Sequence, residues 1–210
     1  MSMRCQYVIL DQLTSVMNRK DLFATPFFLS QIEFNRNQVN YAINNTQCLG
    51  AMSLDQDILN TNFKFLLDPI NDVVSEVMSE LGFKRYDIFS SWMTKTVVGH
   101  RHGLDHMHSN SFMSGVLYLT DKASPIIFRH PLPWRWQSKL DDKNDGVLTS
   151  NQYVMLPKKG DIILFPSHVH HLIMPHKDPI ARCSIAFNVV PTGQYGARDS
   201  NINVSIIKKS

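Results

Sequence analysis

The sequence is poor in cysteine. Its 210 residues include three, Cys5, Cys48 and Cys183, which lie far from one another. An odd number of widely spaced cysteines argues against a disulfide framework, and none has the close spacing of zinc-ribbon ligands. The pattern favours a reducing compartment, and we therefore expect the protein to be cytoplasmic.

The sequence also lacks long apolar runs and a strong charge of either sign. No apolar stretch approaches the length of a membrane span, and residues 1–13 contain at most four consecutive apolar residues. We therefore predict neither a signal peptide nor a membrane partner. The net charge of +3 is spread along the chain and gives no reason to propose nucleic acid as a partner. Nothing in the sequence indicates an oligomeric state.

Length and composition fit one domain with a sizeable core. Hydrophobic residues make up 43% of the chain and charged residues 19%, which is an ordinary globular balance. We predict a single domain over residues 1–210. Within it, residues 1–85 form a support of helices and strands, residues 86–191 form a core of short strands, and residues 192–210 form a loosely structured tail.

Helices are predicted mainly in the first part of the chain. The polar segment Asn35–Asn45 is one candidate. In Asn62–Leu81 apolar residues recur at near-helical spacing, which predicts an amphipathic helix that begins or breaks near Pro69. Gly82 is a suitable C-cap for it. Leu22–Phe34 is rich in aromatic and branched residues and predicts one or two strands.

From Tyr86 onward the pattern changes to short runs that are typical of strands. The predicted strands are Tyr86–Val98, Ser111–Leu119, Ile126–Phe128, Gln152–Leu156, Asp161–Phe165, His170–Met174 and Ala181–Val190. Trp92, in the first of them, is expected in the core. Helices followed by a run of strands indicate a mainly β fold, a jelly roll with N-terminal helices packed on one sheet. The long polar segment between Pro131 and Asn151 has a length that is typical of functional or mobile loops.

Histidines cluster in two places. His106 and His108 lie two residues apart, and in an extended strand residues i and i+2 point to the same face, so both imidazoles can reach one metal ion. A second cluster, which ends in His171, follows after a long insertion. A single His-x-His would be read as a solvated polar loop, but two such clusters on separate strands favour a metal site inside a β-barrel or jelly roll.

The predicted strand Ala181–Val190 alternates between an apolar face and a face that carries Arg182 and Ser184. An arginine on an inward face needs an anionic partner, because an unpaired buried charge is costly. The guanidinium group also suits bidentate binding of a carboxylate. This strand therefore needs either a buried acidic residue or an anionic ligand, unless Arg182 lies in an ordinary salt bridge or on an exposed edge.

These motifs together resemble a known family. The order and spacing of the motifs resemble the 2-oxoglutarate–Fe(II) oxygenases of phages and bacteria, whose wider relatives are the prolyl-hydroxylase-like dioxygenases. The resemblance covers nearly the whole chain and rests on His106-x-His108, Ser114–Leu119, Gly160–Ser167, His171, and Arg182-x-Ser184 through Asn188.

The resemblance implies a double-stranded β-helix, a jelly-roll or cupin-like fold, with iron at its open mouth. His106 would be the first iron ligand and His171 the distal one. Arg182, helped by Ser184, would hold the distal carboxylate of the cosubstrate 2-oxoglutarate.

Tyr118, and after it Ser114, would hydrogen-bond the cosubstrate, because both share strand parity with His106 and His108 if no bulge intervenes. The alternative for Tyr118 is core packing with its hydroxyl bonded to backbone.

The chain departs from the usual set of iron ligands. That set is two histidines and one carboxylate, but the residue two positions after His106 is His108. We rank His108 first as the third ligand. Asp105 ranks second, because an adjacent residue on a regular strand points the other way, and Asn110 is a remote third.

The resulting hypothesis is an Fe(II)-dependent dioxygenase that hydroxylates an unidentified substrate with O2 and converts 2-oxoglutarate to succinate and CO2. A protein side chain, a small metabolite or a modified nucleobase remain open as the substrate. If the chain is encoded by a phage, its compartment is the host cytoplasm. The alternatives are a cupin-like three-histidine metalloenzyme of another class, such as an isomerase or lyase, and a non-catalytic jelly-roll binding module.

Overall fold

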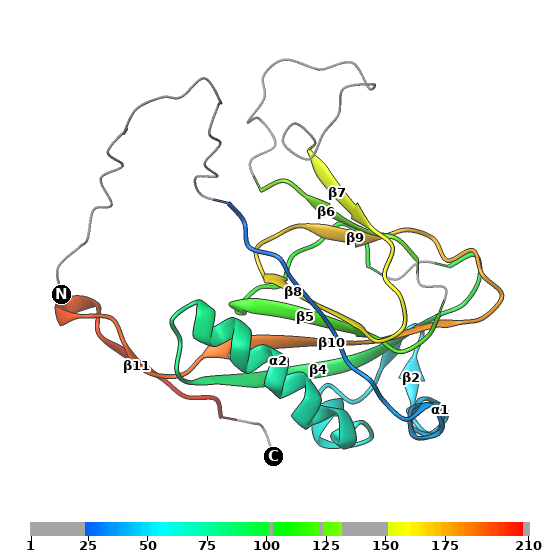
Figure 1. The fold of residues 1–210 in the computed structure, drawn as a ribbon, viewed down its shortest axis with the longest axis horizontal. Helices are drawn as coiled ribbons and strands as arrows, with labels where there is room; N and C mark the ends of the chain where they lie inside the picture. The colour runs from blue at the N-terminus through cyan, green and yellow to red at the C-terminus, as the bar shows by residue number, and fades with distance from the viewer. Residues whose placement is uncertain (1–23, 101–102, 122–123, 132–150, 208–210) are drawn as a thin grey trace, which may run out of the picture.

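The computed structural model describes residues 24–100, 103–121, 124–131 and 151–207, and two antiparallel sheets dominate it (Figure 1). The larger sheet has seven strands in the order β1-β8-β5-β10-β4-β3-β2. Their bounds are β1 (Phe28–Gln31), β2 (Cys48–Leu49), β3 (Met52–Ser53), β4 (Tyr86–Thr96), β5 (Met113–Tyr118), β8 (Asp161–Pro166) and β10 (Arg182–Pro191). The predicted mainly β class with few helices is confirmed.

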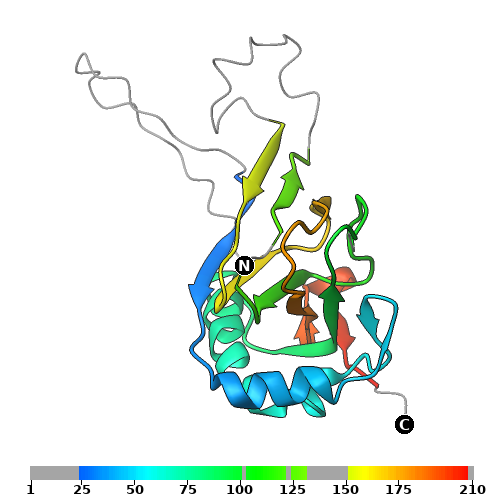
Figure 2. The same cartoon turned by 90° about the vertical axis from the view of Figure 1, so that its right-hand side faces the viewer.

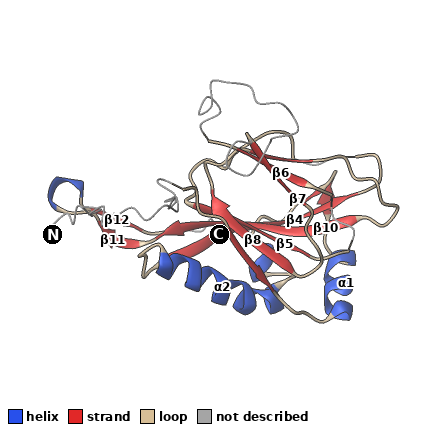
Figure 3. Ribbon diagram, turned by 45° about the horizontal axis from the view of Figure 1, so that its top comes forward, coloured by secondary structure: helices blue, strands red, loops and turns tan. Residues whose placement is uncertain are grey.

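The smaller sheet has three strands in the order β7-β6-β9. They are β6 (Ile126–Arg129), β7 (Gln152–Met155) and β9 (His171–Ile173). Figures 1 and 3 show this sheet beyond one face of the larger sheet, while the helices lie along the opposite face. The two faces of the larger sheet therefore meet different environments.

The helices cover one face only. In Figure 2, α1 (Arg36–Asn44) and α2 (Leu67–Glu80) lie together below the strands. The side chain of Asn35 caps α1 by accepting hydrogen bonds from two backbone amides of its first turn. A 3-10 turn at Lys64–Leu66 leads into α2, and Pro69 is tolerated because it lies in the first turn, where backbone amides lack helical partners. Both predicted helices are confirmed. Two further short 3-10 turns are Ile58–Asn60 and Arg198–Ser200.

The main core lies between α2 and the larger sheet. α2 contributes Ile70, Val74, Val77 and Met78, and β10 contributes Cys183, Ile185, Phe187 and Val189. Phe187 lies directly over Gly115 of β5, its register partner. A Cβ atom at Gly115 would come 2.1 Å from the Phe187 ring. Glycine is therefore required at this position by the packing of the aromatic ring.

A second apolar cluster lies between the two sheets. Its buried members are Tyr118, Ile126, Phe128, Ile163, Phe165, Val169 and Ile173. Phe128 of the smaller sheet packs edge-on against Phe165 of the larger one, with ring centroids 4.9 Å apart. Both rings also lie beside His171, with centroids 6.0 Å (Phe128) and 4.9 Å (Phe165) from its ring.

Some sequence predictions need correction. The tail is not loosely structured, because β11 (Gly193–Tyr195) and β12 (Ile202–Val204) pair as a hairpin. The short strands β2 and β3 were not predicted. Residues 132–150, which form the predicted loop, lie outside the described residues. In the described part of the chain, no helix is long and apolar enough to cross a membrane.

Candidate metal centre

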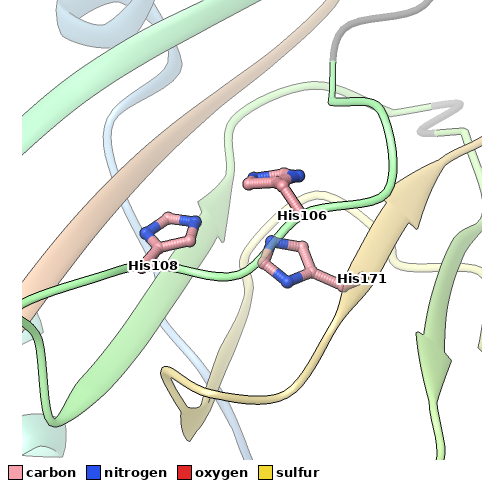
Figure 4. A group of neighbouring side chains, drawn as sticks. All are labelled: His106, His108 and His171. Atoms are coloured by element: carbon pink, nitrogen blue, oxygen red, sulfur yellow. The ribbon is translucent and has the colours of Figure 1, made fainter.

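Three histidines gather next to the second apolar cluster, where the ring of His171 lies 4.9 Å from that of Phe165. His106 and His108 lie on the segment that precedes β5, and His171 begins β9 (Figure 4). One nitrogen of each ring lies within 4.8 Å of the others. Two nitrogens bound to one ion at about 2.1 Å are at most about 4.2 Å apart, so small side-chain rotations bring all three onto a shared metal ion. The structure thus brings together the three residues predicted as ligands.

Backbone pairing holds these segments side by side. His106 and His171 form an isolated antiparallel bridge, with reciprocal N–H···O distances of 3.0 and 2.9 Å. The amide of His108 donates to the carbonyl of Ser167 at 3.0 Å. The short ladder keeps this segment extended, so the side chains of His106 and His108 lie on the same side of it.

The segment is not one continuous strand, however. A turn at Ser109 and Asn110 separates the histidines from β5, and Asn110 has a φ of 57°, in the left-handed region that asparagine tolerates. Strand parity between His108 and Ser114 therefore could not be assumed from the sequence. Asn110 itself is exposed.

Each imidazole uses its second nitrogen to contact an oxygen. The Nδ1 atoms of His106, His108 and His171 lie 2.5, 2.8 and 3.1 Å from the carbonyl of Leu104, Oδ1 of Asn188 and the carbonyl of Val169, respectively. A carbonyl oxygen only accepts hydrogen bonds, so Nδ1 must carry the proton and donate it. The lone pair then lies on Nε2 of each ring, which is the form that binds a metal.

Burial also keeps two of these rings, those of His108 and His171, neutral. It lowers the pKa of His171 from 6.5 to about 4, only partly opposed by the hydrogen bond to Val169. Burial likewise lowers the pKa of His108, against the raising effect of its bond to Asn188. A neutral imidazole offers a lone pair at neutral pH, and hence these two rings are ready to bind a cation without first losing a proton.

Asp105, the second-ranked candidate for the third ligand, is engaged elsewhere. Its carboxylate pairs with Arg129 and lies 3.3 Å from Nδ1 of His170. Burial would raise the pKa of Asp105, but the hydrogen bonds from Arg129 and His170 outweigh it and hold the pKa below its usual value. The structure does not bring this carboxylate into the group of three histidines.

The histidines line a cavity of about 340 Å³. Its walls include Ser114, Arg182 and Ser184, three of the predicted cosubstrate residues. The cavity contains no acidic side chain among the described residues that line it. Tyr118, the fourth predicted residue, is fully buried behind this wall.

Arg182 lies at the inner end of the cavity and is 1% exposed. Its guanidinium lies over the ring of Tyr118, 5.3 Å from the centroid, and donates a long 3.4 Å hydrogen bond to Thr94. Thr94 in turn shares a 2.8 Å hydrogen bond with Ser184. Within the described part of the chain, no carboxylate forms an ion pair with Arg182.

Three buried polar atoms at this end lack hydrogen-bond partners among the described residues. They are Nε of Arg182 and the hydroxyls of Tyr118 and Thr96. Thr96 is the register partner of Arg182 on β4, and Tyr118 pairs with Ser184, so these atoms belong to three adjacent strands. Burial raises the pKa of Tyr118, partly offset by the nearby guanidinium, so its hydroxyl stays a donor. A cation flanked by two hydroxyl donors matches the needs of a carboxylate ligand.

Two residues of the site were missed in the sequence. Trp92 was expected in the core, but it lines the cavity and stacks on His108, with ring centroids 5.6 Å apart. It shares a face of β4 with Thr94 and Thr96, and this alternation was the available signal. Asn188 shares the polar face of β10 with Arg182, but nothing in the sequence showed that it would reach a histidine.

The fold is that of solved 2-oxoglutarate oxygenases. HygX from Streptomyces hygroscopicus, solved with nickel and 2-oxoglutarate, is 11% identical with a TM-score of 0.51, over 80% of this chain and 83% of that one. A prolyl-4-hydroxylase from Pseudomonas putida is 14% identical with a TM-score of 0.52, over 80% and 94%. The carbocyclase SnoK of nogalamycin biosynthesis is 10% identical with a TM-score of 0.57, over 80% and 81%. At these identities the likeness concerns the fold alone.

The sequence itself is similar to one family. Residues 90–188 match the model of the family described as "Putative 2OG-Fe(II) oxygenase". The matched segment contains both histidine clusters and most of β10, and over these residues the resemblance predicted from the sequence is confirmed. No curated protein sequence matches the chain.

Proposed function

We propose that this protein is a 2-oxoglutarate- and Fe(II)-dependent oxygenase that hydroxylates a second substrate. The observation that carries the proposal is the buried guanidinium of Arg182, which has no anionic partner among the described residues and shares one cavity with three imidazoles. An uncompensated buried charge is costly, so the site is built for an anion that is supplied from outside. A dicarboxylate that also reaches a metal ion satisfies both ends of the cavity.

The proposal includes the double-stranded β-helix. Four strands of the larger sheet lie in the order β8-β5-β10-β4, and the smaller sheet has the order β7-β6-β9. The bridge from His171 to His106 adds the segment before β5 to the edge of the smaller sheet. Two facing four-strand layers of this kind make a jelly roll. We propose residues 86–191 as this core, residues 1–85 as its support and residues 192–210 as a tail of the same domain.

At the metal end, His106, His108 and His171 would hold Fe(II). Iron with bound 2-oxoglutarate supplies the oxidative chemistry, in which O2 oxidises the substrate while the cosubstrate becomes succinate and CO2. The protein's own part is to present three Nε2 lone pairs and to leave the remaining positions around the ion for ligands.

At the inner end, Arg182 would bind the distal carboxylate of 2-oxoglutarate, with the hydroxyls of Tyr118 and Thr96 as further donors. Ser184 positions Thr94, which accepts a hydrogen bond from Arg182. The hydroxyl of Ser114 donates to Asn188 at 2.9 Å. We therefore give Ser114, which lines the cavity, a supporting role beside the cosubstrate.

The test of this function is turnover of 2-oxoglutarate without added substrate. Purified protein with Fe(II) and O2 is expected to form succinate, and Arg182→Ala and His171→Ala are expected to abolish it. Asp105→Asn, next to the site but outside the group of three, is the control and should retain activity. A wild-type protein that binds iron but leaves 2-oxoglutarate unchanged would favour a three-histidine metalloenzyme of another class. A protein that binds neither would favour a binding module.

The ligand assignment is tested by metal content. Elemental analysis should find one Fe(II) per chain in the wild type, none in His171→Ala and markedly less in His108→Ala. Asp105→Ala should keep its iron, and so should His108→Asp, which restores the commoner carboxylate. Loss of iron in Asp105→Ala together with retention in His108→Ala would show that the third ligand has been assigned wrongly.

A further inference from the structure

Asn188 lies on the polar face of β10, beneath the proposed metal site. Its side-chain oxygen lies 2.8 Å from Nδ1 of His108, and its side-chain nitrogen donates to Oγ of Ser90 at 3.1 Å. Ser114 donates to the same side-chain oxygen at 2.9 Å. Asn188 is 8% exposed, so water has little access to these groups. The amide thus joins strands β4, β5 and β10 to a single imidazole.

His108 depends on this amide more than the other two histidines depend on any side chain. His106 and His171 each donate Nδ1–H to the backbone carbonyl two residues before them. Such a carbonyl is present whatever the sequence. His108 lies over the sheet instead, and the acceptor of its Nδ1–H is the side chain of Asn188. Of the three contacts, this one alone can be removed by a substitution.

The orientation of the amide decides which nitrogen of His108 is free. With Oδ1 toward the ring, Nδ1 must carry the proton and Nε2 keeps the lone pair. With the amide reversed, its N–H group would face Nδ1 and require the lone pair there, which would leave the proton on Nε2. The structure has the first orientation, in which Nδ2 donates to Ser90 and Ser114 donates to Oδ1.

We propose that Asn188 is a positioning residue, which fixes the tautomer and the ring orientation of His108 and so makes a histidine usable in place of the carboxylate of the usual iron-ligand set. This inference rests on the proposed function, because it assumes that His108 binds the metal. The hydroxyls of Ser114 and Ser167, 2.8 Å apart, and of Ser167 and Ser111, 2.9 Å apart, continue the network away from the ring. The neutral amide adds no charge to a site that has no acidic ligand.

The first measurement uses metal-free protein labelled with 15N-histidine. Long-range 1H–15N spectra distinguish a protonated ring nitrogen from a bare one, and His108→Ala assigns the signal. Wild type and Asn188→Asp should both show His108 protonated at Nδ1, because a carboxylate also accepts from this nitrogen, from Ser90 and from Ser114. Asn188→Leu, with no acceptor, should lose this preference. Asn188→Ala replaces it if the leucine variant does not fold.

The second measurement is titration with Co(II), whose visible spectrum reports the ligand set. Removing the partner of a metal-binding histidine typically weakens metal affinity by about 10–100-fold. We expect a loss of this size in Asn188→Leu, wild-type or tighter affinity with an unchanged spectrum in Asn188→Asp, and a smaller loss in Ser90→Ala. Thermal melting of the metal-free variants separates these effects from loss of fold.

Two results would overturn the proposal. One is a folded Asn188→Leu variant that keeps the Nδ1-protonated form and wild-type Co(II) affinity. The other is an Asn188→Asp variant that loses as much affinity as Asn188→Leu, which would mean that a hydrogen-bond acceptor at position 188 is not what supports His108. A wild-type protein that binds no Co(II) would contradict the proposed function instead, and the tautomer measurement would still decide what Asn188 does to His108.

Discussion

The two faces of strand β10 are equally buried but differ in how their side chains are satisfied. One face carries Cys183, Ile185, Phe187 and Val189, which pack against α2 and its neighbours. The other carries Arg182, Ser184, Ala186 and Asn188, which face the cavity. The apolar face is complete without any ligand. On the polar face, Arg182 and its neighbours Thr96 and Tyr118 on adjacent strands keep buried polar atoms without partners.

The comparison shows that burial alone does not distinguish a structural residue from a functional one. Burying an apolar side chain stabilises the fold, whereas burying a polar atom without a partner costs free energy. On β10 buried apolar side chains alternate with buried polar ones, some of which lack partners. One face of the strand therefore stabilises the fold, and the other face forms a ligand site. Substitutions on the apolar face should therefore lower the free energy of unfolding, and substitutions on the polar face should lower ligand affinity.

The largest expected effect is on the apolar face. Phe187→Ala removes the ring that lies over Gly115 and leaves a cavity in the main core. Such truncations typically lower the free energy of unfolding by about 3–5 kcal/mol. Denaturant unfolding monitored by circular dichroism measures the change. The folded fraction of the variant should still bind Co(II). A loss of metal binding without a loss of stability would contradict the assignment of stability to the apolar face and ligand binding to the polar face.

Next is Arg182, on the polar face. Removing one partner of a buried charged pair costs about 2–5 kcal/mol in binding, so Arg182→Met should weaken 2-oxoglutarate binding by that amount. Calorimetric titration of the iron-loaded protein under anaerobic conditions measures it. Because the buried charge has no anionic partner among the described residues, its replacement by an apolar side chain should leave stability equal or higher. A large loss of stability would show that Arg182 has a structural role.

A smaller effect depends on pH and returns to the apolar face. Burial raises the pKa of Cys183 from 9.0 to about 11. The unfolded chain loses this proton first, so stability is full below pH 9.0 and declines as pH rises toward 11, by about 2–3 kcal/mol at most. Urea unfolding across this range, compared with Cys183→Ala, isolates the contribution. A variant with the same alkaline decline as the wild type would contradict this prediction.

The smallest expected effect concerns Tyr118. Its hydroxyl has no hydrogen-bond partner among the described residues, so Tyr118→Phe should leave stability nearly unchanged. If the hydroxyl donates to 2-oxoglutarate, its loss should weaken binding by about 0.5–1.5 kcal/mol. The same calorimetric titration measures this. Unchanged affinity would indicate that Tyr118 only packs in the core and does not contact 2-oxoglutarate.

Alternation along strands was the part of the structure that could be predicted from the sequence. It placed the seven strands that the structure describes between Tyr86 and Pro191 and separated the two faces of β10. It also placed His106 and His108 on one side of an extended segment. Period-2 patterns work here because the sheets are buried on one or both faces, so that the side-chain pattern follows the local environment.

What could not be predicted depends on pairing between distant segments. The strands β2 and β3 are two residues long, too short to show a pattern. Trp92 looks like a core residue until β4 is aligned with β10, which places its ring beside His108. The partner of His108 is 80 positions away, and only the register of β10 against β5 and β4 brings it there.

The reciprocal hydrogen bonds between His106 and His171 have a consequence for the energetics of metal capture. They join two ligands 65 positions apart in the chain before any ion arrives. If the ion itself had to bring these segments together, the free energy of metal binding would include the entropy cost of closing a long loop. Here folding has already closed that loop, and the ion needs only to draw in side chains. Metal-free protein should therefore keep the shape of the site, and amide hydrogen exchange at these two residues should be slow with or without the metal.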